Sequence, residues 1–135
     1  MAATGYPMKS RIISSLVISV ILLGACAGNL RAADAPKEDQ ALFDKLIKAI
    51  VDGDYDAFVA DGVGTFKQMT QDQFNAAVMQ LSPRLNAGYE AVYLGTVKKK
   101  GAHVALWRVS FKDIEDEALA TLAVKDGKIS AFTIR

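Results

Sequence analysis

His103, Tyr93 and Trp107 are the residues of this sequence best suited to chemistry or ligand binding. His103 is the only histidine of the chain, and an imidazole can take up and release protons near neutral pH. Residues four apart in a strand point to the same face, so His103 and Trp107 share a face. Tyr93 and Trp107 are candidates for the lining of a ligand pocket, although packing in a hydrophobic core explains them equally well.

A catalytic histidine is usually oriented by a carboxylate. We place no Asp or Glu inside the predicted sheet, because Glu90 begins a strand and the acidic run 113–117 falls in a loop. We therefore expect His103 to be structural, and we predict no catalytic residue and no cofactor. The alternative is a small lyase or isomerase in which Tyr93 and His103 transfer the protons.

The acidic residues near position 54 resemble part of a calcium-binding loop. Asp52, Asp54 and Asp56 match its first, third and fifth positions, but Ala57 and Val63 stand where the loop requires Gly and Glu. A helix end followed by a helix cap explains these acids more simply. With one His and one Cys in the chain, we predict no metal site.

The charges of the chain are balanced and scattered. Sixteen basic residues stand against fifteen acidic ones among 135 residues, for a net charge of +1, which argues against nucleic-acid binding. Lys98, Lys99 and Lys100 form one short basic run, which we interpret as a solvated turn.

Residues 1–25 are typical of a signal peptide. Lys9 and Arg11 precede an apolar run from Ile12 to Leu23, and small residues follow it. The run is too short for a membrane span, which needs about 20 apolar residues. We expect an exported protein in which residues 26–37 form a linker and residues 38–135 form one domain.

Cys26 is the only cysteine and follows Leu23, Gly24 and Ala25. These four residues resemble the bacterial lipobox, whose cysteine is lipidated and becomes the first mature residue. Ala25, Cys26 and Ala27 also fit an ordinary signal-peptidase site, so both alternatives stay open. We expect a periplasmic protein or a membrane-anchored lipoprotein of a bacterial cell envelope, which meets the membrane only through its anchor.

Helices are predicted in the first half of the domain. From Glu38 to Val51 the apolar residues recur every three or four positions, which indicates an amphipathic helix that ends at Gly53. Asp54 can cap a second, short helix that runs to Ala60.

A third helix begins after a segment, 65–69, that we expect to be extended. Thr70 and Gln73 fit a capping box, in which each side chain accepts a hydrogen bond from the backbone N–H of the other residue. Ser82-Pro83 is expected to open one more turn, separate from this helix.

Four strands are predicted after Gly88, at residues 89–98, 102–111, 118–125 and 128–135. Asp126-Gly127 is a two-residue hairpin turn, because both positions tolerate a positive φ. The register that follows pairs Val124 with Ile129, Leu122 with Ala131 and Ala120 with Thr133. In the first hairpin, Tyr93 is expected opposite Trp107 and Val97 opposite His103.

With this register, both faces of the sheet carry apolar side chains. Leu119, Phe132 and Ile134 point to one face, while Leu122, Val124, Ile129 and Ala131 point to the other. Three helices can cover only one face. We therefore expect the outer face to pair with a second copy, giving a homodimer.

The order of elements resembles the nuclear transport factor 2-like superfamily, which has a cystatin-like α+β cone. The resemblance covers about residues 39–135 and also rests on Gly53-Asp54-Tyr55 and on Asp126-Gly127-Lys128-Ile129. It implies an α+β fold in which three N-terminal helices pack on a curved antiparallel sheet of four main strands, with a pocket at the open end. Many members dimerise through the outer sheet face.

The sequence is most similar to the small secreted bacterial members of that superfamily, which have no assigned activity. The motifs of its dehydratases and isomerases do not carry over. We therefore expect a non-catalytic exported domain that binds a small apolar ligand or a protein partner in the cell envelope.

Overall fold

The first helix of the domain buries one stripe of apolar side chains. The computed structural model describes residues 34–135, so the predicted signal peptide and Cys26 lie outside the described residues. Helix α2 (Lys37–Asp52) buries Phe43, Leu46 and Ile50 at helical spacing. It ends at Gly53, whose φ of 66° lies in the left-handed region, as the sequence predicts.

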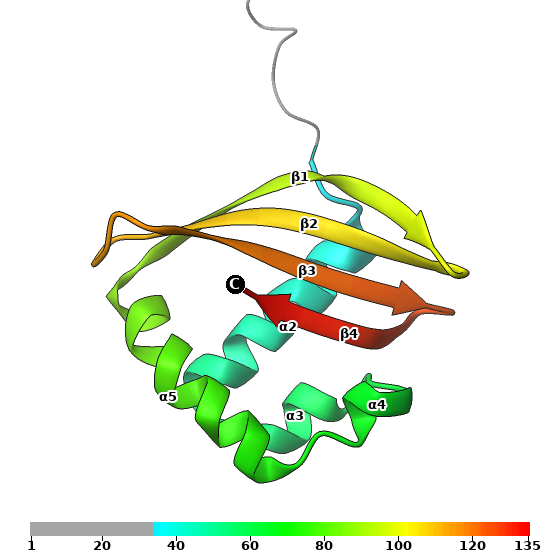
Figure 1. Cartoon of the computed structure of the whole chain (residues 1–135), viewed down its shortest axis with the longest axis horizontal. Coiled ribbons are helices and arrows are strands. Elements are labelled where there is room, and N and C mark those ends of the chain that lie inside the picture. Colours follow the sequence, from blue (N-terminus) through cyan, green and yellow to red (C-terminus); the bar gives the residue numbers. More distant parts are fainter. Residues whose placement is uncertain (1–33) are drawn as a thin grey trace, which may run out of the picture. The chain divides into compact units, whose positions relative to one another are not determined.

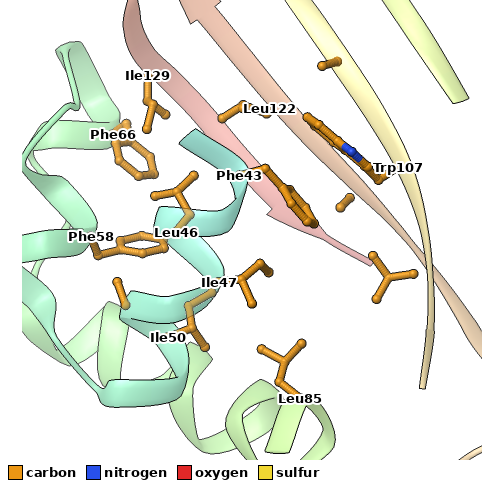
Figure 2. Packing of buried hydrophobic residues seen from close by; sticks show 14 of the residues in the cluster. Phe43, Leu46, Ile47, Ile50, Phe58, Phe66, Leu85, Trp107, Leu122 and Ile129 are labelled. Carbon is orange, nitrogen blue, oxygen red and sulfur yellow. The ribbon is translucent and has the colours of Figure 1, made fainter. Parts of the chain in front are cut away.

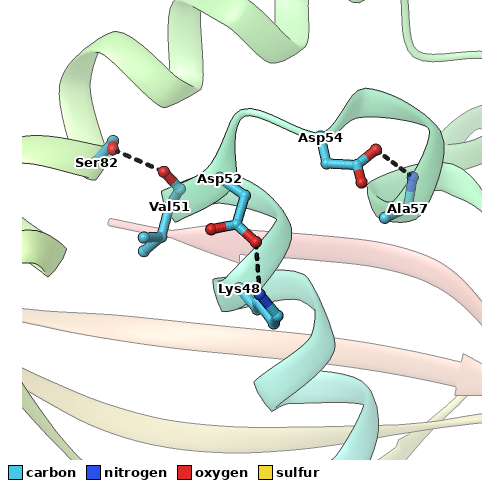
Figure 3. A network of polar contacts seen from close by, with 6 residues as sticks. All are labelled: Lys48, Val51, Asp52, Asp54, Ala57 and Ser82. Carbon is cyan, nitrogen blue, oxygen red and sulfur yellow. Dashed lines mark hydrogen bonds and ion pairs between the residues drawn. The ribbon is translucent and has the colours of Figure 1, made fainter.

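Two short helices follow α2. Helix α3 (Tyr55–Val59) is capped as predicted, because the Asp54 carboxylate accepts a hydrogen bond of 3.0 Å from the backbone N–H of Ala57 (Figure 3). Helix α4 (Gly64–Lys67) replaces the extended segment expected at 65–69, and that prediction is wrong. The helical turn brings Phe66 into the core against Phe58, with ring centroids 5.2 Å apart.

Helix α5 (Gln71–Ala87) starts at the predicted capping box. The Thr70 N–H donates to Gln73 Oε1 at 3.0 Å, and the Gln73 N–H donates to Thr70 Oγ1 at 3.3 Å. The helix runs through Pro83 without the expected break. Proline removes one backbone donor, and the carbonyl that it leaves without a partner belongs to Met79, a residue that is 80% exposed and open to water.

The second half of the domain is one antiparallel sheet in the order β1-β2-β3-β4 (Figure 1). Its strands are β1 (Tyr89–Lys99), β2 (Ala102–Phe111), β3 (Glu117–Lys125) and β4 (Lys128–Ile134). Five of the eight strand bounds coincide with the prediction. The bounds at Lys99, Glu117 and Ile134 each differ from it by one residue. Asp126 and Gly127 take φ values of 51° and 74° in the predicted hairpin turn.

Two β-bulges correct the predicted register. An irregularity between Ile129 and Ala131 places Leu122 opposite Phe132 instead of Ala131. It likewise places Ala120 opposite Ile134 instead of Thr133. Ser130 is the extra residue.

A second bulge lies at Leu94. Tyr93 pairs with Trp107, as predicted, but Val97 pairs with Val104 and His103 pairs with Lys98. The predicted pairing of Val97 with His103 is therefore wrong.

The helices cover one face of the sheet and enclose the core (Figures 1 and 2). Because of the bulge at Ser130, Phe132 and Ile134 turn towards the helices and pack against the core. Phe43 of α2 stacks on Trp107 with ring centroids 4.4 Å apart. Residues 34–135 thus form one compact α+β unit with its own hydrophobic core, as expected of a domain that folds by itself.

The other face of the sheet is uncovered among the described residues. This face is less apolar than predicted, because the bulge at Ser130 turns Phe132 and Ile134 to the face that the helices cover. The side chains that give it apolar character are Val92, Val97, Val104, Leu106 and Leu119.

The two margins of the sheet differ. At the β4 margin, the N–H of Ile129 donates to the carbonyl of Asp61, and the N–H of Val63 donates to the carbonyl of Ile129, both at 2.8 Å. The segment around Gly62 thereby forms a short parallel bridge to β4. At the other margin, β1 pairs only with β2 among residues 34–135. None of the helices in this part of the chain is long and apolar enough to cross a membrane.

Candidate functional site

An open groove of about 660 Å³ lies where the start of α2 meets β1 and β2. Two of the three predicted pocket residues, Tyr93 and His103, line it. The complete lining is Pro36, Lys37, Glu38, Asp39, Tyr93, Thr96 and His103. This volume is within the range of about 300–1,000 Å³ that is typical of small-molecule sites.

His103 is held by a buried carboxylate at the edge of this groove. Its Nε2 atom lies 2.8 Å from Oδ1 of Asp39, a residue that is only 3% exposed. The imidazole itself is 40% exposed. Where Asp39 is ionised its carboxylate can only accept a hydrogen bond, so Nε2 is the donor and Nδ1 is the ring nitrogen that Asp39 does not occupy.

The expectation that His103 lacks a carboxylate partner is therefore wrong. The two residues are 64 positions apart in the sequence, and the packing of α2 on β2 brings them together. A sequence signal for Asp39 exists, since it precedes Phe43 by four positions and Leu46 by seven and so shares the buried stripe of α2. A carboxylate on an apolar stripe needs a partner in the core.

Tyr93 contributes a ring and a hydroxyl to the groove. Its hydroxyl is hydrogen-bonded to Thr96 Oγ1, which the bulge at Leu94 brings to the same face of the sheet. The ring lies edge-on to Trp107, with centroids 5.8 Å apart. The phenol is thus oriented from both ends.

Trp107, the third predicted pocket residue, lies in the core rather than along the groove. It is 1% exposed and stacks on Phe43. Its indole N–H donates to Oε1 of Gln40 at 3.3 Å, which satisfies the one polar atom of the side chain. Trp107 and Phe43 thereby fill the space between α2 and the sheet.

The acidic residues between α2 and α3 have structural partners (Figure 3). Asp52 forms an ion pair of 2.6 Å with Lys48, and this hydrogen bond raises the pKa of Lys48. Asp54 caps α3. Within residues 34–135, no three His, Cys, Asp or Glu side chains lie close enough together to hold a metal ion.

No protein-family model and no curated protein matches the chain. Among solved structures, a Sinorhizobium meliloti protein described as a "putative polyketide cyclase" is 15% identical, with a TM-score of 0.37, covering 70% of this chain and 94% of its own. An NTF2-like protein of unknown function from Cytophaga hutchinsonii is 8% identical, with a TM-score of 0.39, covering 77% and 93%.

The α+β class predicted from the sequence, with N-terminal helices on a four-stranded antiparallel sheet, is confirmed by the architecture of residues 34–135. One of these two structures is described as NTF2-like, and the sequence resembles the nuclear transport factor 2-like superfamily.

Proposed function

We propose that this protein is an exported, non-catalytic domain that binds a small, largely apolar ligand in the groove beside His103. The observation that carries the proposal is the convergence of Tyr93, Thr96 and His103 on one open groove. The interior between α2 and the sheet is occupied by Trp107 and Phe43, so a ligand has room in the groove but not in that interior.

The chemistry of the groove suits a flat ligand with one polar group. The ring of Tyr93 and the ring of Pro36 offer apolar surface. His103 offers one ring nitrogen, since Asp39 already holds the other. Lys37, Glu38 and Thr96 add further polar side chains to the lining, so the groove offers both polar groups and apolar surface to a ligand.

Titration with the neutral fluorescent probe N-phenyl-1-naphthylamine tests ligand binding. We expect its fluorescence to rise on binding and its affinity to fall about tenfold in Thr96→Leu, which narrows the groove. Thr65→Leu, at an exposed position of α4, is the matched control and should bind as the wild type does. Equal affinity of both variants would place the probe elsewhere and remove the proposal.

One contact favours a second candidate, a small lyase or isomerase. A histidine oriented by a buried carboxylate, as His103 is by Asp39, can act as a general base. Tyr93 would then donate a hydrogen bond to the substrate oxygen. Against this, the Tyr93 hydroxyl is already bonded to Thr96, and an open groove does not exclude water.

Deuterium uptake from heavy water by the α-protons of 1-indanone distinguishes the two candidates. A non-catalytic domain leaves the exchange at the rate of the buffer alone. Exchange that is faster with the wild type and returns to the buffer rate in His103→Gln would establish proton transfer and overturn the non-catalytic proposal.

We further propose that the uncovered sheet face pairs with a second copy. Leu119, which is 44% exposed, and the partly exposed Val104 and Leu106 give this face apolar surface, although less than the sequence predicts. Mass measurement in solution tests the pairing. A dimer that becomes monomeric in Leu119→Glu supports it, and a wild-type monomer at high concentration rules it out.

A further inference from the structure

The sheet topology gathers lysines from two hairpins at one end of the domain. The first hairpin turns at Lys100 and Gly101, and the second turns at Asp126 and Gly127. His103 of β2 pairs with Val124 of β3, so the two turns lie side by side. Neighbouring strands are about 4.8 Å apart, so the four strand ends span roughly 14 Å.

Six of the ten lysines in residues 34–135 lie at this end, which we call the lysine end. They are Lys37, Lys98, Lys99, Lys100, Lys125 and Lys128, and all six are exposed. The acidic residues beside them are Asp34, Glu38, Asp39, Asp61 and Asp126. Asp39 is buried against His103 and Asp61 is paired with Lys45, so three carboxylates remain to offset the six lysines. The lysine end therefore carries a net positive charge in a chain that is nearly neutral.

An acidic run lies at the opposite end. Asp113, Glu115 and Asp116 lie in the β2–β3 loop, and Glu117 begins β3. The ten residues of β2 separate this loop from the lysine end by roughly 30 Å. That separation exceeds the Debye length of about 8 Å at physiological salt, so a charged surface would meet the two ends separately.

We propose that the lysine end docks on the surface of an anionic phospholipid bilayer. The surface of such a bilayer is negatively charged, and its attraction for a lysine falls off within about a Debye length of the surface. Lysines that lie close together can therefore reach this layer at the same time, and each one adds to the affinity. Val97, which is 51% exposed, adjoins Lys98 and offers an apolar side chain to the interface.

The point where the chain enters the domain supports this orientation. Pro36 and Lys37 line the same groove as Thr96 and His103, so the segment that leads back to Cys26 joins the domain near the lysine end. An anchor at Cys26, about ten residues before Pro36, would hold this end next to the membrane.

Co-sedimentation with vesicles tests the docking. The chain is produced without residues 1–26, so that neither the apolar leader nor a lipid on Cys26 contributes. Vesicles of phosphatidylcholine with about a quarter phosphatidylglycerol are compared with pure phosphatidylcholine at about 0.1 M salt. We expect binding to the anionic vesicles only, weakening as salt is raised.

Two charge-neutralising double variants locate the surface. Lys98→Gln/Lys99→Gln and Lys125→Gln/Lys128→Gln should each lower the vesicle partition coefficient about 30-fold, because each lysine contributes about fivefold. Lys48→Gln/Lys112→Gln removes the same charge elsewhere and should change the coefficient less than about threefold. Circular dichroism verifies that every variant is folded.

Three results would overturn the proposal. Equal losses in the control and in the hairpin variants would mean that net charge, not the lysine end, drives binding. Equal binding to neutral vesicles would mean that the attraction is apolar. Tighter binding to a DNA duplex than to anionic vesicles at the same salt would make the lysine end a nucleic-acid surface instead.

Discussion

The contact between Asp39 and His103 predicts an asymmetric double-mutant cycle. His103→Ala removes the partner of a carboxylate whose side chain is only 4% exposed. Asp39→Ala removes the partner of an imidazole that is 40% exposed. The first variant leaves a buried acceptor without a donor, whereas the second leaves a donor that water can reach.

The magnitudes follow from these exposures. A buried acceptor without a partner costs about 1–3 kcal/mol, and we expect about 1–2 kcal/mol for His103→Ala because removal of the ring lets some water approach. Asp39→Ala should cost about 1 kcal/mol, the value of an ordinary hydrogen bond. The double variant should cost no more than His103→Ala alone, which gives a coupling energy of about 1 kcal/mol.

Urea unfolding of the four proteins, followed by circular dichroism, measures the cycle. Each free energy of unfolding is extrapolated to water, and the unfolding slope m is compared across the set. Costs that add to within about 0.5 kcal/mol would show that the two side chains do not interact in solution. A larger cost for Asp39→Ala than for His103→Ala would refute the argument from burial.

Three further predictions concern the elements that support the site. Thr70→Ala should lower the free energy of unfolding by about 1 kcal/mol, because it removes one half of the capping box; Thr70→Ser should restore most of the loss in thermal melts. Deleting Ser130 should lower the free energy of unfolding by less than about 2 kcal/mol, because it removes the bulge and leaves Phe132 facing the core. Deleting Thr121 reverses the faces of part of β3 and should lower it by more than about 3 kcal/mol. Similar losses for the two deletions in urea unfolding would contradict the assignment of the bulge. The hydrogen bond from Lys45 lowers the pKa of Asp61. The ion pair therefore stabilises the fold at pH values above the ordinary pKa of a carboxyl group, and this stabilisation is lost as the pH falls through the lowered pKa. Lys45→Gln should therefore reduce the free energy of unfolding by less than about 1 kcal/mol at pH 7 and by no measurable amount near pH 2, and a difference that persists in acid would rule out this ion pair as its cause.

The helices and strands could largely be predicted because their ends are set by local chemistry. The side chains of Thr70 and Gln73 cap the start of a helix. A positive φ is adopted at the end of a helix by Gly53 and in a hairpin turn by Asp126 and Gly127. The bulges have no such signal. Ser130 becomes an extra residue because Phe132 gains its contacts with Phe43 and Phe58 only when it faces the helices. That gain depends on packing between distant segments, which a strand pattern does not contain.

The candidate site could be predicted in part. Tyr93 and His103 were identified by residue type, and the structure places both at one groove. Asp39 was missed because its partner lies 64 positions away and because an acidic residue in the first helical turn has an ordinary explanation in the helix dipole. Trp107 has the residue type of a pocket wall, but its stacking on Phe43 makes it part of the core.

The margin of β1, which has no second strand partner among residues 34–135, has a consequence for solubility. A free strand edge presents backbone donors and acceptors to which another chain can add, and this is a common route to fibrils. Here the bulge at Leu94 interrupts the flat edge, and Lys98 and Lys99 place charge near its end. The same lysines that we assign to the membrane thus also keep copies of the chain from joining edge to edge while they are free in solution.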